Sequence, residues 1–239
     1  MIRGFYTALS GILSSMTRQN IVADNIANVN TPGFKESRSA QKDFGFMLTS
    51  SLDGHLMGPL GTATIATGLM LDRLQGPLEA TNLITDLGIE GDGLFAIGTT
   101  QGIRYTRAGD FEIDVNGTLT TQRGEPVLDV TGLPIHVPDR ATFGVAPDGT
   151  VAGSGQRIAL VAFPPDGVTR VGNNLYTLAG VPRPATGAIH QGFLEHSNVD
   201  LATSMTELMT LQRSFSLSSR ALTIQEQTIG EANDVGRVR

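Results

Sequence analysis

Residues that could perform chemistry are few in this sequence, and their spacing does not favour it. Of the four histidines, only His190 and His196 are close together, and no acidic or histidine ligands flank them at metal-binding spacing. The absence of cysteine excludes thiol catalysis and thiolate metal sites. No Gly-x-Ser-x-Gly nucleophile elbow occurs. We therefore expect no catalytic residue, no metal, no cofactor and no small-molecule substrate.

A glycine-rich segment at residues 88–93 imitates a phosphate-binding loop. Its spacing differs from Gly-x-Gly-x-x-Gly, and residues 94–97 after it have the pattern of a strand instead of a helix. The segment therefore predicts a tight turn between two strands.

A second segment that resembles a ligand-binding loop is the acidic stretch that begins at Glu112. It matches the start of a calcium-binding loop, but position twelve of that loop would be Arg123, where a bidentate acidic ligand is required. Asn116-Gly117 lies between alternating apolar and polar residues, which is the strongest short signal for a β-hairpin. The stretch therefore predicts a hairpin and no calcium site.

Composition narrows the class of protein further. The chain has 239 residues, of which 40% are hydrophobic, enough for one or two cores. Its net charge of −6 argues against a nucleic-acid binder, because such proteins gain affinity by neutralising phosphates. With 29 Gly and 11 Pro, we expect many short elements joined by tight turns.

Apolar residues near the N-terminus recur at steps of three and four, which predicts an amphipathic helix. The stripe consists of Ile2, Phe5, Leu9, Ile12, Met16, Ala23 and Ile26. The helix is expected to end at residues 30–33, because Pro32 disfavours helical geometry in the residue before it and Gly33 permits a positive φ.

The C-terminal part repeats this pattern and predicts a second long helix, capped by Asp200 or Asn198. Its stripe consists of Leu201, Met205, Leu208, Leu211, Phe215, Leu222 and Ile229. The polar tail after Ile229 is expected to fray.

The middle of the chain has the pattern of an antiparallel β domain. Besides the Asn116-Gly117 hairpin, turns are expected at Asp148-Gly149 and Asp166-Gly167, and the apolar run 157–163 predicts a buried strand. Residues 35–73 are rich in Gly, Ser and Thr and show no clear period, so we expect an extended connector.

The predicted fold class is therefore α+β: long N- and C-terminal helices forming a coiled-coil-like pair, with an inserted, mainly antiparallel β domain. The predicted domains are residues 1–34, 35–73, 74–191 and 192–239. Two helices cover only a narrow seam of each other, so the surplus of both stripes predicts an assembly interface with other subunits.

Two segments resemble the signatures of the bacterial flagellar basal-body rod and hook proteins. The first follows the N-terminal helix, as it does in that family, and the second precedes the C-terminal helix. The first signature includes Asn25, Asn28, Thr31, Pro32, Gly33 and Phe34. The second includes Gln191, Gly192, Leu194, Glu195, Ser197, Asn198 and Val199. Residues 75–79, 86–95 and 105–111 also fit the family, so the resemblance extends over essentially the whole chain.

The resemblance implies a structural rod subunit of the FlgF or FlgG type, and residues 233–238 lean towards FlgF. It also implies paired axial helices, and self-assembly with other rod and hook proteins into a helical tube. Such a subunit would pass through the flagellar type III export apparatus without a cleaved signal peptide, to the basal body outside the cytoplasmic membrane.

Two alternatives come from other classes of protein. An extracytoplasmic β-domain enzyme or carbohydrate-binding module with helical appendages is disfavoured by the lack of Trp and the 5% aromatic content. A membrane-surface protein would need many cations on the polar face of its first helix, where only Arg3 and Arg18 stand.

Overall fold

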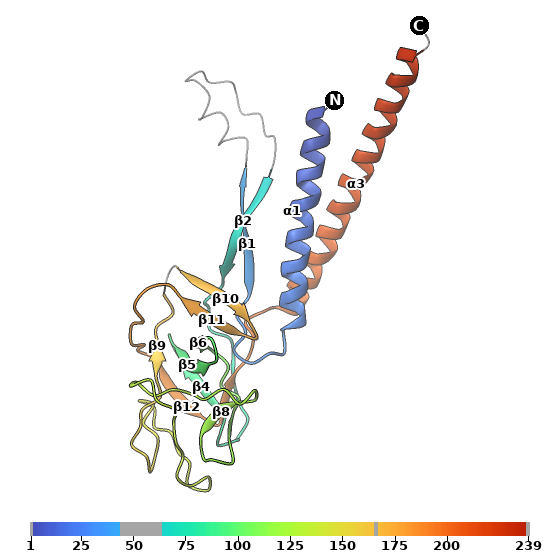
Figure 1. Cartoon of the computed structure of the whole chain (residues 1–239). Helices are drawn as coiled ribbons and strands as arrows, with labels where there is room; N and C mark the ends of the chain where they lie inside the picture. The colour runs from blue at the N-terminus through green and yellow to red at the C-terminus, as the bar shows by residue number, and fades with distance from the viewer. Residues whose placement is uncertain (1, 44–63, 165–166, 238–239) are drawn as a thin grey trace. The chain divides into compact units, whose positions relative to one another are not determined.

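The computed structural model describes residues 2–43, 64–164 and 167–237, and for residues 2–8, 40–43, 64–69, 229 and 232–237 the backbone alone. In this part of the chain the fold is α+β, with two long helices and mainly antiparallel sheets (Figure 1). The helices are α1 (Ile2–Ala27) and α3 (Leu201–Arg237). The strands are β1 (Ser37–Asp43), β2 (Thr64–Leu71), β3 (Leu78–Ala80), β4 (Leu87–Glu90), β5 (Leu94–Thr99), β6 (Gly102–Thr106), β7 (Phe111–Ile113), β8 (Leu119–Thr121), β9 (Leu160–Val161), β10 (Val168–Gly172), β11 (Leu175–Leu178), β12 (Ala188–Gln191) and β13 (Phe193–Glu195).

The chain divides into two compact units. The helical unit comprises Met1–Ala27, Ser37–Asp72 and Asp200–Arg239, and the β unit comprises Asn28–Glu36 and Arg73–Val199. Two short segments that the sequence pattern assigned to the helical ends, residues 28–34 and 192–199, thus fold as part of the β unit.

In the helical unit, α1 and α3 pack along each other in opposite directions (Figure 1). Arg18 of α1 pairs with Glu207 of α3, with 2.6 Å between guanidinium nitrogen and carboxylate oxygen. A methyl group placed on Gly11 would lie 3.8 Å from the Ser218 hydroxyl oxygen. Small residues at this seam allow the two backbones to approach closely.

The ends of both helices differ from the prediction. α1 ends at Ala27, before residues 30–33, because the turn already begins where the Thr31 amide donates to the Asn28 carbonyl oxygen, at 3.0 Å. α3 continues to Arg237 instead of ending near Ile229. Glu and Ala after Gly230 are good helix formers, and one glycine costs only about 1 kcal/mol.

The start of α3 agrees with the predicted cap. One carboxylate oxygen of Asp200 accepts the backbone amides of Ala202 and Thr203, at 2.9 and 3.3 Å. Hydrogen bonds from Thr203 and Ala202 lower the pKa of Asp200. Asp200, and not Asn198, is therefore the N-cap.

The connector contains a strand pair that the sequence pattern did not predict. β1 and β2 pair antiparallel, with Ser37 opposite Leu71, and both pack against α1. Residues 44–63 lie outside the described part of the chain. The pair was missed because neither strand shows a sustained alternation of apolar and polar residues.

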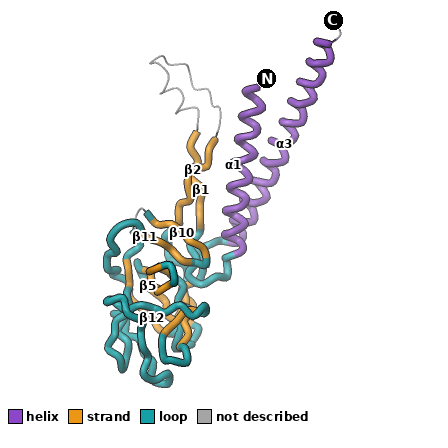
Figure 2. Tube along the Cα trace, viewed as in Figure 1, coloured by secondary structure: helices purple, strands orange, loops and turns teal. Residues whose placement is uncertain are grey.

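The β unit is built from short strands joined by many loops and turns, as Figure 2 shows and as the content of Gly and Pro predicted. Its largest sheet has the strand order β10-β11-β6-β5-β9, and the remaining strands form two-stranded pairs. The core gathers fully buried residues from several sheets and from the loops between them, among them Leu87, Phe95, Leu119 and Ile135.

Three of the predicted turns are confirmed. β7 and β8 form the hairpin around Asn116-Gly117, with Ile113 opposite Leu119. Residues 91–93 connect β4 to β5, so the turn is shorter than the predicted segment 88–93. Gly149 has a φ of 86° in the turn after Asp148. Asp166 lies outside the described residues, and the strand expected at 157–163 is shorter, since β9 covers only Leu160–Val161.

Candidate functional site

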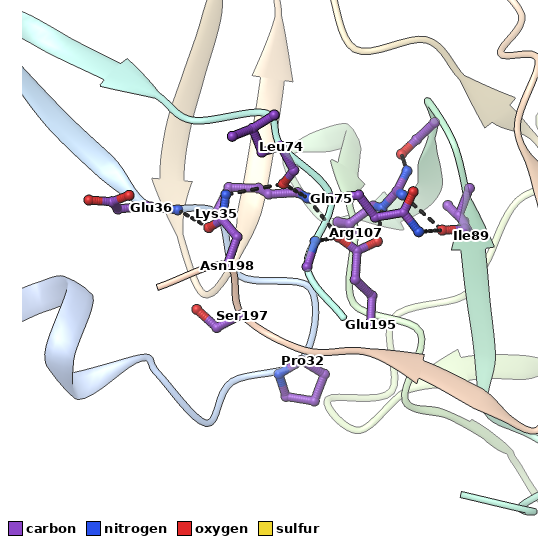
Figure 3. Close-up of polar contacts among 12 residues, drawn as sticks. Pro32, Lys35, Glu36, Leu74, Gln75, Ile89, Arg107, Glu195, Ser197 and Asn198 are labelled. Atoms are coloured by element: carbon purple, nitrogen blue, oxygen red, sulfur yellow. Dashed lines mark hydrogen bonds and ion pairs between the residues drawn. The ribbon is translucent and has the colours of Figure 1, made fainter. Parts of the chain in front are cut away.

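The two signature segments, which are 160 residues apart in sequence, meet inside the β unit. The Gly33 amide donates to the Glu195 carbonyl oxygen at 2.7 Å, and the Glu36 amide donates to the Asn198 side-chain oxygen at 2.7 Å. We call this meeting point the signature junction: residues 32–36 and 195–198, together with residues 74–76 and Arg107 (Figure 3).

Three buried charges occupy the centre of the signature junction. One carboxylate oxygen of Glu195 accepts the Lys35 ammonium at 2.6 Å, and the other accepts the Arg107 Nε at 2.6 Å. The Gly76 amide also donates to this carboxylate, at 3.0 Å. All three charged side chains are at least 95% buried. Buried charges are tolerated only when paired and hydrogen-bonded in this way.

Arg107 also organises the turn at residues 88–93. Its terminal guanidinium nitrogens donate to the carbonyl oxygens of Ile89 and Gly91, at 2.8 and 2.7 Å, and to that of Gly93. Gln75 reinforces the turn, since its amide donates to the Ile89 carbonyl oxygen at 3.2 Å (Figure 3). The glycine-rich segment therefore presents its carbonyls to a cation of its own chain, which agrees with the turn interpretation.

Phe34, next to Lys35 in sequence, lies in a buried pocket of the β unit. Its side chain is fully buried, and the Arg170 guanidinium carbon lies 4.0 Å from the centre of its ring. The Asn174 amide donates to the Pro32 carbonyl oxygen at 2.8 Å, and the Tyr176 hydroxyl donates to the Asn174 side-chain oxygen at 3.3 Å. Burial raises the pKa of Tyr176 to about 12. Arg170 thus contacts the ring of Phe34, and Asn174 holds the backbone at Pro32.

Asn198 ties together the chain segments that leave the β unit. Its amide nitrogen donates to the Leu74 carbonyl oxygen at 3.1 Å, while its side-chain oxygen accepts the Glu36 amide. The Lys35 ammonium donates to the same Leu74 carbonyl oxygen, at 2.7 Å. Three distant segments are therefore cross-linked by side chains from both signatures.

The sequence pattern missed Lys35 and Arg107 as junction residues. Both stand in segments that resemble the family, but nothing in their spacing connects them to Glu195. No local signal was available, because the partner of both residues is Glu195, which is 160 residues from Lys35 and 88 from Arg107 in sequence.

Gly33 has a φ of 64°, as the turn prediction required. A Cβ at this position would lie 2.3 Å from the carbonyl carbon and 2.4 Å from the carbonyl oxygen of Arg107. Such distances are far inside van der Waals contact, so the glycine is required by close packing as well as by its φ.

Asn25 performs a separate role, within the helical unit. Its side-chain nitrogen donates to the Ser37 carbonyl oxygen at 2.9 Å, and its side-chain oxygen accepts the Ser37 amide at 3.0 Å. Asn25 is 2% exposed. The side chain therefore binds both backbone groups of Ser37, as a paired β-strand would, and holds the start of β1 against α1.

Replacing Asn25 with Asp should free the start of β1. The carboxylate would keep the acceptor for the Ser37 amide but would face the Ser37 carbonyl oxygen with no donor, at a cost of about 1–3 kcal/mol. We expect the Ser37 amide to exchange its hydrogen correspondingly faster. Asn20→Asp, on the exposed face of the same helix, is the matched control and should leave this exchange unchanged. Equal exchange in both variants would contradict the role of Asn25.

The other signature residues form local contacts. Gln191 donates from its side chain to the Ile84 carbonyl oxygen at 2.6 Å, and Gly192 has a φ of 78°. The Ser197 hydroxyl accepts the Val199 amide at 3.3 Å. Of the remaining signature residues, Leu194 is half-buried on β13, and the Thr31 hydroxyl donates to the Asn28 side-chain oxygen at 3.3 Å.

The predicted assembly residues occupy different environments. Those half-buried are Leu9, Ile12, Ile26, Leu208, Phe215 and Leu222, and Leu211 is buried. Those exposed are Met16, Ala23, Leu201 and Met205. The side chains of Ile2, Phe5 and Ile229 lie outside the described part of the chain. The two helices also bury residues that the stripes did not include: Val22, Ser14, Ser15 and Ser204.

The structure also shows exposed apolar residues that the stripes omitted: Leu13 on α1, and Met209, Leu217 and Ile224 on α3. Met209 is 60% exposed and Leu217 is 66% exposed. Together with Met205, these three residues of α3 form what we call the outer face of the helix, because Leu211 and Ser204 are buried on another side.

The histidines of the described residues lie at the surface of the β unit. His190 pairs with Glu90, and His196 with Glu79, on exposed surface of the β unit. His136 is exposed, and His55 lies outside the described residues. Over the described ranges, no three His, Asp or Glu side chains gather closely enough to hold a metal ion. None of the described helices combines the length and apolar character needed to cross a membrane.

Three family models match successive parts of the chain. Residues 5–35 match the flagella basal body rod protein model, and residues 88–153 match the D1 domain of the flagellar hook protein FlgE/F/G model. Residues 190–235 match the C-terminal model of the flagellar basal body rod FlgEFG proteins. The first and third matches contain the two signature segments that meet at the junction.

Curated relatives are similar over nearly the whole chain. The flagellar basal-body rod protein FlgG of Bacillus subtilis is 34% identical, with 99% of this chain and 100% of the relative covered. The flagellar basal-body rod protein FlgF of Caulobacter vibrioides is 36% identical, with 90% of each covered. FlgG of Borreliella burgdorferi is 32% identical, again with 99% of this chain covered.

Proposed function

Because the chain belongs to the family of flagellar basal-body rod proteins, we propose that its terminal helices are the axial elements through which it assembles. Its role is that of a structural rod subunit, as the names of its relatives state for them. The alternative of a carbohydrate-binding module or enzyme has no support from the family matches. We propose that no catalysis accompanies the structural role.

The observation that carries the assembly proposal is the outer face of α3. Met205, Met209, Leu217 and Ile224 are 47–66% exposed, although α3 already buries another side. A helix with two apolar sides has more apolar surface than one partner helix covers. Helices from neighbouring subunits supply the missing cover, in a coiled-coil-like axial layer with α1 and α3 paired.

An open assembly follows from the geometry of such a contact. The outer face of α3 is not the surface that α1 uses, so it would meet a different surface on the next subunit. A head-to-tail contact of this kind gives a helical tube unless the rotation closes a ring. The other occupants of the tube are rod and hook proteins of the same family.

We further propose that the chain reaches the basal body through the flagellar type III export apparatus, without a cleaved signal peptide, and functions outside the cytoplasmic membrane. The support for this route is membership of the family.

The assembly proposal is tested by placing lysines on the outer face. We expect Met209→Lys with Leu217→Lys to abolish swimming, because two cations would be buried between helices without a partner. Thermal unfolding of the β unit should be unchanged, since neither residue belongs to it. Motility and secreted protein are measured together in cells.

The matched control is Ser214→Lys, an exposed position of the same helix outside the outer face, which should swim normally. Normal swimming by the double variant would overturn the axial role of this face.

A further inference from the structure

We propose that residues 188–199 are the closing segment of the β unit: its sheets and core cannot form until this segment is in place. The closing segment contains β12, β13 and the whole of the second signature. Every strand pair, core contact and charge pair that it supplies joins it to residues far earlier in the chain.

The first contribution of the closing segment is main-chain pairing. β12 pairs with β4 and β13 pairs with β3, each in a two-stranded sheet. Within the described residues, β3 and β4 therefore have no other strand partner. Gly88 of β4 is buried and lies opposite His190 of β12, so without β12 its backbone groups would lose their partner strand away from water, which folded proteins avoid.

The second contribution is to the core. Ile189 is 1% exposed and packs in the same cluster as Leu87 and Phe95. The side-chain oxygen of Gln191 accepts the Val145 amide at 3.1 Å, and its nitrogen donates to the Phe143 carbonyl oxygen at 3.2 Å. The closing segment therefore holds the loop at residues 143–145 against the rest of the core.

The third contribution is electrostatic. Glu195 supplies the carboxylate for both Arg107 and Lys35, which are at least 95% buried in the folded unit. A guanidinium removed from water without its carboxylate is strongly unfavourable. The closing segment therefore supplies the carboxylate that neutralises the buried charges of Arg107 and Lys35.

The contacts of the closing segment are expected to form slowly, because they join residues far apart in sequence. Glu195 lies 119 residues after Gly76 and 88 after Arg107 in sequence. Such non-local contacts form slowly, because the entropy of closing the intervening loop is lost before they contribute. The free energy lost without all three contributions exceeds the small net free energy of unfolding of a domain. We therefore expect no stable β unit before the closing segment is in place.

A chain is synthesised from its N-terminus, so residues 1–187 all exist before the closing segment does. The β unit would therefore remain unfolded while most of the chain is made or threaded through a channel. The value of this delay for export rests on the proposed function. The folding behaviour itself does not, because it is a property of the purified chain.

The first test follows refolding of the full-length chain by pulsed hydrogen exchange. We expect the amides of β5 and β6 to gain protection in the same kinetic phase as those of β12 and β13. If β5 and β6 become protected about tenfold or more faster than β12, the inference is wrong.

The second test replaces the closing segment, residues 188–199, by a Gly/Ser sequence of equal length in the full-length chain. Amide protection in β5 and β6 should fall by about 1,000-fold or more. The matched control replaces residues 216–227 of α3 in the same way, and protection in β5 and β6 should change by less than about threefold. Retained protection in the first variant, or equal loss in both, would overturn the proposal.

Discussion

Replacing Glu195 with Ala should lower the free energy of unfolding of the β unit by about 3–5 kcal/mol, the cost of leaving a buried charge without its partner. The substitution leaves both Arg107 and Lys35 buried, and it also removes the acceptor of the Gly76 amide. Denaturant unfolding followed by the near-ultraviolet dichroism of tyrosine measures the change, because Tyr105 and Tyr176 are buried in this unit.

The matched control is Glu90→Ala. Glu90 also pairs with a basic side chain, His190, but both partners are well exposed, and such pairs contribute little. We expect its unfolding free energy to change by less than about 1 kcal/mol. A similar small change for both variants would show that the buried charge cluster does not stabilise the β unit.

Replacing Gly33 with Ala should cost about 3 kcal/mol or more, in two separable parts. An L-residue at positive φ costs about 1–2 kcal/mol. The added methyl group would also overlap the backbone of Arg107, which cannot rotate away as a side chain could, and overpacking adds about 1–3 kcal/mol. The same unfolding measurement gives the total.

Gly155 allows the two parts to be separated. Its φ of 66° is close to the 64° of Gly33, but a Cβ there would meet nothing within 4 Å. Gly155→Ala should therefore show only the backbone cost. If both variants lose the same stability, the close approach of Gly33 to Arg107 has no energetic importance.

Local signals in the sequence were sufficient for the two long helices and for the hairpin of β7 and β8. Steps of three and four placed both helices, and the carboxylate of Asp200 marked the start of α3. Asn116-Gly117 specified the hairpin, because few residues other than Gly adopt the conformation of that turn. Each of these features depends on residues close together in sequence.

Features that depend on distant residues were not predictable in the same way. Nothing near Arg107 indicates that its partner is Glu195, since the pairing exists only once β3 and β13 lie side by side. Val22 and Ser204 are buried although neither stripe includes them, whereas Met16 and Met205 of the predicted stripes are exposed. Ser14 and Ser15 are also buried and belong to neither predicted stripe.

The signature junction also has a mechanical consequence. The chain crosses between its two units four times, after residues 27, 36, 72 and 199. Lys35, Glu36, Leu74 and Asn198 stand beside three of these crossings and are hydrogen-bonded to one another. A pulling force on one of these three chain segments is therefore shared with the other two. Separating a single segment requires several hydrogen bonds to break together.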